Sequence, residues 1–138
     1  MKFLKNSTFV TNLKLFYENG KFDLNVSFPK DYPWSPPTVH FLTKVYHPNI
    51  DYTTGEICLS LLDKENKDET GWRPAHNITS IMLSIQSFLT DPNVDDPMNV
   101  RIASEFRDNR KQFEDMARKW TIKYAINKEK WNPDDWNF

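Results

Sequence analysis

Strict alternation of apolar and polar side chains predicts an extended strand over residues Lys21 to Phe28. Every second residue of this segment is large and apolar: Phe22, Leu24, Val26 and Phe28. The period of two indicates that one face of the strand is buried. Asn19-Gly20 precedes it and is a strong turn signal, so Asn12 to Tyr17 is expected to pair with it as a hairpin.

A proline-rich loop separates this strand from the next. The prolines of "DYPWSPP", residues 31–37, fix φ and remove backbone donors, which predicts a stiff, extended surface loop. Thr38 to Thr43 is expected to form the second strand. The following region, residues 45–75, is rich in turns and has no sustained period. A connection of that length inside a compact domain is more often functional than idle.

Apolar residues at three- and four-residue steps predict helices in the second half of the chain. Asn77 is a suitable N-cap for the first helix, and Asp91-Pro92 ends its pattern. The three apolar stripes are Ile78, Ile81, Met82, Ile85 and Leu89; Val100, Ala103 and Phe106; and Phe113, Met116, Ala117, Trp120 and Tyr124. Strands followed by helices predict an α+β fold, an antiparallel meander sheet with helices packed on one side.

The chain reads as one domain with a short tail. Its 138 residues can bury roughly two-thirds of the unfolded surface, so no metal or disulfide is needed for stability. Neither a repeat nor a linker interrupts residues 1–126, which we take as the domain. Residues 127–138 form a tail with two tryptophans and no helical stripe.

Composition narrows the location and the partners. A single cysteine cannot form an internal disulfide, and no apolar run suits a signal peptide or a membrane span. We therefore expect a cytoplasmic protein, with the nucleus as a second location. Lys and Arg number 18 against 19 Asp and Glu, without a block of either sign, which argues against nucleic acid as a partner. No Cys/His spacing indicates a metal site.

The only cysteine, Cys58, has two readings. Its neighbours Ile57 and Leu59 favour a small buried hydrophobe, because free cysteine is among the most buried residue types. The alternative is a nucleophile. His47 lies eleven residues earlier, so the base of a Cys-His hydrolase also stays open at this point.

Four segments in fixed order carry a resemblance to a known family: "KVYHPNI" at 44–50, "GEICLSLL" at 55–62, "GWRPA" at 71–75 and "DPNVDDPMN" at 91–99. Each is weak alone, but their order and spacing together are very specific. They resemble the ubiquitin-conjugating enzyme family. The similarity runs from about residue 12 to residue 125 and implies the fold of that family.

The resemblance implies an acyltransferase. Cys58 would accept the C-terminus of a modifier from an activating enzyme as a thioester and pass it to a substrate lysine. The expected partners are ubiquitin or a Nedd/Rub-type modifier, the activating enzyme, a RING-type ligase and the protein substrate, with the chain itself a monomer. No cofactor is expected, because ATP is used by the upstream activating enzyme.

The resemblance also assigns roles around Cys58. His47 would brace the active-site loop through backbone hydrogen bonds. Asn49 would donate to the oxyanion or hold the loop that does so, and it also suits a turn asparagine. Asp96 would orient the incoming lysine and help to remove its proton, unless Asp95 and Asp96 only serve the turn. Ser60 would support the site at a position where many relatives have an aspartate, so the site has one carboxylate fewer.

Two loops resemble the ligase-binding surface of the family. Trp34 on the proline-rich loop and Arg73, Pro74 and Ala75 on the second loop match its docking positions. An exposed aromatic residue beside prolines is a good anchor, because it loses little side-chain freedom on binding. The alternative is that Trp34 folds back onto the core.

The chain departs from the family pattern in two places. "MKFLKNSTFV" stands where relatives have an N-terminal helix and a first strand, so we expect the N-terminus to be truncated or divergent and charging to be the step at risk. A non-catalytic modifier- or ligase-binding module of the same fold is therefore the alternative. "DKENKDET", residues 63–70, is expected to be a solvated excursion near the active site. Similar lengthening occurs in the Nedd/Rub branch, whereas "ARKWTIKYA" resembles ubiquitin conjugators, towards which the modifier assignment leans.

Overall fold

The computed structural model describes the backbone of residues 2–10 and 16–136 and the side chains of residues 16–135. Within this part of the chain, the sheet is an antiparallel meander of β1 (Lys2–Val10), β2 (Lys21–Phe28) and β3 (Thr38–Phe41). The helices follow as α1 (Ile78–Thr90), α2 (Val100–Asp108) and α3 (Arg110–Trp120), which continues into a π-helical segment, Thr121–Ile126. Short 3-10 turns occupy Ser60–Leu62 and Pro133–Trp136.

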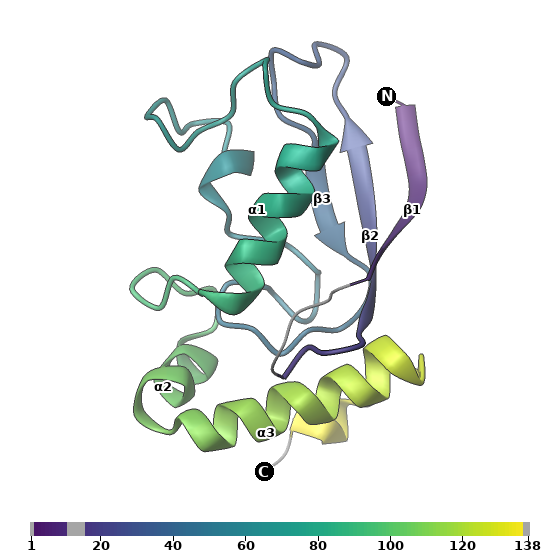
Figure 1. Ribbon diagram of the computed structural model, residues 1–138, viewed down its shortest axis with the longest axis vertical. Coiled ribbons are helices and arrows are strands. Elements are labelled where there is room, and N and C mark those ends of the chain that lie inside the picture. Colours follow the sequence, from purple (N-terminus) through teal and green to yellow (C-terminus); the bar gives the residue numbers. More distant parts are fainter. Residues whose placement is uncertain (1, 11–15, 137–138) are drawn as a thin grey trace.

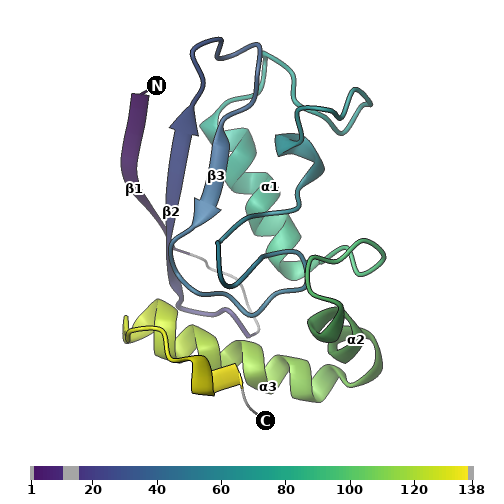
Figure 2. The ribbon, with the colours of Figure 1, turned by 180° about the vertical axis from the view of Figure 1, so that it is seen from behind.

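The predicted α+β class is confirmed. Figure 1 shows α1 lying over one face of the sheet, while α3 runs across the end of the sheet. Figure 2 shows the same arrangement from behind, with the meander in front of α1. None of the helices built from the described residues is long and apolar enough to cross a membrane.

β2 has the predicted bounds, but its predicted partner is wrong. The strand pairs with β1, from Lys2 opposite Phe28 to Val10 opposite Lys21, rather than with Asn12 to Tyr17. Residues 11–15 of that segment lie outside the described residues. Tyr17 packs in the core, where its ring is removed from water more completely than it would be on a strand edge. The predicted turn is present, with Asn19 at φ 62° and the Gly20 N–H donating to the Tyr17 carbonyl at 3.1 Å.

β3 ends two residues earlier than predicted, because Leu42 and Thr43 do not continue the regular pairing with β2. The amides of Leu42 and Thr43 both donate to the Asp23 carbonyl, at 2.8 and 3.3 Å. The free edge of β3 instead receives the segment before Cys58, through a bridge between His40 and Glu56. The sheet thereby positions the chain that leads to the cysteine.

The proline-rich loop is not extended as predicted. Its backbone folds into consecutive turns, with the Tyr32 N–H donating to the Pro29 carbonyl at 3.2 Å and the Trp34 N–H to the Asp31 carbonyl at 2.8 Å. Turns of this kind satisfy backbone groups locally. The turns direct Trp34 outward while Pro36 lies buried beneath the loop.

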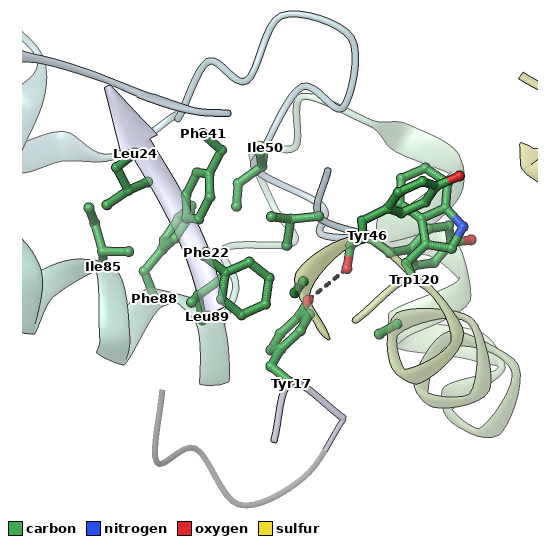
Figure 3. Close-up of a cluster of buried hydrophobic side chains, with 14 of the residues drawn as sticks. Tyr17, Phe22, Leu24, Phe41, Tyr46, Ile50, Ile85, Phe88, Leu89 and Trp120 are labelled. Carbon is green, nitrogen blue, oxygen red and sulfur yellow. Dashed lines mark hydrogen bonds between the residues drawn. The ribbon is translucent and has the colours of Figure 1, made fainter. Parts of the chain in front are cut away.

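The predicted helix after Asn77 is confirmed to within one residue at its end. The Asn77 side chain accepts from the Ser80 N–H and the Ser80 hydroxyl accepts from the Asn77 N–H, which forms a capping box. Figure 3 shows how α1 and α3 meet the sheet across a shared core. Its fully buried members include Phe22, Leu24, Ile85, Leu89 and Trp120.

The described part of the tail folds back onto this core. Trp131 packs edge-on against Trp120 with ring centroids 5.2 Å apart, and its ring is tilted against that of Tyr52 at 5.8 Å. Asp135 forms an ion pair with Lys123 at 2.6 Å. The described part of the tail, for which the sequence pattern predicted no role, therefore packs against Trp120.

We predict that Gly55→Ala lowers the free energy of unfolding by about 2 kcal/mol or more. Gly55 has φ +79°, and an added Cβ would lie 2.0 Å from the Phe41 carbonyl oxygen, a backbone atom that cannot move aside. Urea denaturation measures the change. Thr53→Ala, on the same turn and exposed, is the control and should change the value by less than about 0.5 kcal/mol. Equal stability of the two variants would contradict this reading of the turn.

Candidate active site

The site is built on a buried segment, residues 47–49. The His47 side chain is fully buried, with its Nε2 3.0 Å from the Phe88 carbonyl and its Nδ1 accepting from the Asn49 N–H at 3.1 Å. Since a carbonyl can only accept, Nε2 carries the proton. Burial lowers the pKa of His47 to about 3. The imidazole is therefore neutral, and neither ring nitrogen is left to act as a base for Cys58.

Asn49 holds the loop between α1 and α2. Its Nδ2 donates to the Asn93 carbonyl at 2.7 Å and to the Asp96 carbonyl at 3.1 Å. Its Oδ1 is buried and has no hydrogen-bond partner among the described residues. The preceding carbonyl, that of Pro48, accepts from the Met98 and Asn99 amides at 2.9 and 3.0 Å. The side-chain amide of Asn49 thus fixes the loop by binding two of its backbone carbonyls.

Cys58 is exposed, so the buried position favoured by its apolar neighbours is wrong. Its N–H donates to the Asn49 carbonyl at 3.0 Å, directly after a bridge between Ile50 and Ile57. The chain then enters the Ser60–Leu62 turn, in which Leu61 takes the core position. Leu61 therefore packs in the core, while Cys58 stays exposed.

The thiol opens into a groove of about 550 Å³. The groove lies between four segments, namely the residues around Cys58, the 3-10 turn after them, the end of α1 and the loop that Asn49 holds. Its apolar lining is Ile57, Leu59, Leu62, Phe88 and Met98, and its polar lining is Cys58, Ser60, Asp63, Asn93 and Asp96. The structure therefore brings Cys58, Ser60 and Asp96 together, whereas Asn49 lies behind the groove and does not line it.

Partial desolvation in the groove raises the pKa of the Cys58 thiol, and the negative charges of Asp96 and Asp63 raise it further. The thiol is consequently more protonated at neutral pH than an ordinary cysteine. Sequence reasoning missed Asp63, which it placed in a solvated excursion. The available signal was that Asp63 is an acidic residue only five positions after Cys58.

A second hollow lies beside the proline-rich loop. Trp34 is 76% exposed, which contradicts the alternative that it folds onto the core. The neighbouring Trp72 indole donates to the Pro33 carbonyl at 2.7 Å and ties the two loops together. A cleft of about 250 Å³ between them is lined by Trp34, Trp72, Arg73 and part of residues 63–68. Pro74 and Ala75 are exposed next to it.

No group of three or more His, Cys, Asp or Glu side chains in the described part of the chain is arranged to hold a metal ion. The chemistry available in the groove is that of a thiol beside carboxylates and a hydroxyl. A thiol with this access can form and release a covalent acyl bond.

Comparison with known proteins gives consistent matches. A family model described as "Ubiquitin-conjugating enzyme" matches residues 5–121. The chain is 47% identical over 110 residues to ubiquitin-conjugating enzyme E2 T of Xenopus laevis, covering 80% of this chain and 56% of that protein. It is 46% identical over 114 residues to E2 T of Homo sapiens, covering 83% and 56%. The chain thus spans just over half the length of these relatives.

A solved structure supports the same grouping. The E2 domain of a Toxoplasma gondii ubiquitin conjugating enzyme superposes with a TM-score of 0.77 at 38% sequence identity. The match covers 87% of this chain and 80% of that chain.

We predict that His47 makes stability depend on pH. Its pKa is about 3 in the folded protein against an ordinary 6.5, so the unfolded chain binds the extra proton between these values. Stability from this group is complete above pH 6.5 and falls towards pH 3, by up to about 1.4 kcal/mol per pH unit. Urea unfolding between pH 7.5 and pH 4 measures it.

His47→Gln is the matched variant. At pH 7.5 its free energy of unfolding should be lower by about 2 kcal/mol, because the Phe88 carbonyl and the Asn49 N–H lose well-aligned partners in a buried position. The difference in free energy of unfolding between wild type and variant should shrink as the pH falls, because the variant has no imidazole at position 47 to protonate. Parallel pH profiles of the two proteins would contradict the assignment of a neutral, buried His47.

Proposed function

This chain belongs to the ubiquitin-conjugating enzyme family, and we propose that it accepts the C-terminus of ubiquitin as a thioester on Cys58 and transfers it to a substrate lysine. The observation that carries the proposal is the exposed thiol of Cys58 in a groove of mixed apolar and polar lining. Such a groove suits an extended peptide tail whose terminal carbonyl must reach sulfur.

The first step is an exchange of thioesters. The Cys58 thiolate attacks the carbonyl carbon of the modifier on the activating enzyme, the new C–S bond forms, the old C–S bond breaks, and the activating enzyme's thiolate leaves. A raised thiol pKa lowers the thiolate fraction but makes each thiolate more nucleophilic. The acyl group arrives already activated, so a dedicated histidine base is dispensable.

The second step transfers the acyl group to nitrogen. Negative charge develops on the carbonyl oxygen when an amine attacks, and the loop whose backbone Asn49 holds borders that position. Asn49 thus acts as a positioning residue, the second of the two roles that the resemblance allowed. Asp96, exposed on the same loop, is suited to orient the lysine and accept its proton.

Ubiquitin is the modifier that the relatives favour. The curated relatives are named as ubiquitin-conjugating enzymes, although this chain spans only 56% of their length. A Nedd/Rub-type modifier remains the competing outcome, because residues 63–70 resemble a lengthening in that branch. The proposed partners are an activating enzyme that uses ATP and a RING-type ligase, and the chain needs no cofactor of its own.

We predict that purified chain, activating enzyme, ATP and tagged ubiquitin give an adduct that thiol reductants remove. Cys58→Ala should abolish it, and Cys58→Ser should give a more stable ester, because an oxygen ester resists thiol exchange. Non-reducing gels measure all three. A parallel set with a Nedd/Rub-type modifier and its activating enzyme decides the modifier.

The charging experiment separates the competing classes. Absence of a thiol-sensitive adduct with either modifier would refute the acyltransferase proposal. Binding of modifier or ligase without charging would instead favour the non-catalytic module.

We further predict that Trp34→Ala weakens the affinity for a RING domain that binds the wild-type chain by at least about tenfold. The indole is 76% exposed, so its removal should leave the free energy of unfolding within about 0.5 kcal/mol of wild type. Titration calorimetry with a panel of purified RING domains measures the affinity. Leu42→Ala removes an apolar side chain that is 54% exposed outside this cleft and should leave binding unchanged.

A further inference from the structure

Asp63 brings a carboxylate to the groove that the motif around Cys58 lacks. Ser60, two residues after Cys58, supplies only a hydroxyl, but the 3-10 turn Ser60–Leu62 carries the chain back so that Asp63 also lines the groove. Asp96 lines the same groove from the loop after α1. Two carboxylates from separate segments therefore face one thiol.

Local hydrogen bonds fix the position of Asp63. Its N–H donates to the Ser60 carbonyl at 3.2 Å, and its Oδ1 accepts from the Glu65 N–H at 2.9 Å. Asn66 donates through Nδ2 to the same Ser60 carbonyl at 3.3 Å. Among the described residues, none donates to the second carboxylate oxygen of Asp63. One oxygen thus holds the turn while the other is available to a ligand.

We propose that Asp63, together with Asp96, forms a carboxylate pair that draws the ammonium group of the substrate lysine into the groove and takes a proton from it as the nitrogen attacks. The proposal rests on the thioester function proposed above and adds Asp63 to Asp96 as a residue that binds the amine. Asp63 would touch the substrate itself. The apolar side chains of Phe88 and Met98 line the same groove, where they can contact the aliphatic part of a lysine side chain.

The step balances with the residues present. The ammonium group loses one proton to a carboxylate, its nitrogen forms the C–N bond, and the C–S bond to Cys58 breaks. The released thiolate accepts the second proton, which the raised pKa of Cys58 favours at neutral pH. The carboxylate returns its proton to water, and the products are the amide, the free thiol and one solvated proton.

The same charge has opposite effects on the two partners of the reaction. A carboxylate attracts the cationic amine, yet it disfavours ionisation of the nearby thiol. Removing the charge of Asp63 should therefore speed reactions that need the free thiolate and slow attack by a cationic amine. A residue with only a structural role would not move the two rates in opposite directions.

Asp63→Asn is the decisive variant, because its side-chain oxygen can still accept from the Glu65 N–H. At pH 7 we expect alkylation of Cys58 by iodoacetamide to become about threefold faster. Discharge of the isolated ubiquitin thioester to free lysine should become about tenfold slower. Discharge to hydroxylamine, which is neutral at this pH, should stay within about twofold of wild type, because no ammonium group has to be attracted.

Two controls complete the experiment. Glu65→Gln removes a charge from the same exposed loop but outside the groove, and all three rates should match wild type. Asp63→Glu should restore most of the discharge to lysine. Unchanged discharge of Asp63→Asn to lysine, or equal losses with lysine and hydroxylamine, would overturn the role of Asp63. Failure of the wild-type chain to form a thioester at all would instead refute the proposed function, and the lysine role with it.

Discussion

The arrangement of the candidate site depends on the hydrogen bonds of one buried segment, residues 47–49. His47 is tied to the end of α1, the Pro48 carbonyl to the start of α2, and Asn49 to both the loop between these helices and the amide of Cys58. These groups have no access to water, so each bond that is lost leaves a buried polar group without a partner. The segment therefore fixes the thiol and the loop opposite it relative to each other, and the groove between them is a consequence of that constraint.

The electrostatics of the groove favour one half of the proposed reaction over the other. Partial desolvation and two carboxylates raise the pKa of the Cys58 thiol, which opposes its charging. The same carboxylates favour a cationic acceptor in the discharge step. Such an arrangement is workable where the incoming acyl group is already a thioester, because exchange between thiols needs little driving force from the protein. It also protects the exposed thiol from unwanted reactions, since oxidation and alkylation proceed through the thiolate.

The sequence predicted those features that rest on short-range signals. The alternation in Lys21–Phe28 and the Asn77 cap of α1 both appear as expected, because burial of one face and local capping agree there with the tertiary structure. The predicted partner of β2 was wrong, because an Asn-Gly turn marks where the chain reverses but not which earlier residues pair with the strand that follows. Cys58 illustrates the same limit, since apolar neighbours at positions 57 and 59 reveal a buried surface without revealing which residue points away from it.

The excursion at residues 63–70 explains how a groove can acquire charge without disturbing the core beneath it. Its turns are satisfied internally, with Asp68 accepting from the amide and hydroxyl of Thr70, and these hydrogen bonds lower the pKa of Asp68. Its ends are fixed by the buried Leu61 and by Gly71, where an added Cβ would lie 2.4 Å from the Asn66 carbonyl oxygen. Because Asp63 lines both the Cys58 groove and the cleft beside Trp34, a single residue forms the wall between the two surfaces on which the proposed transfer depends.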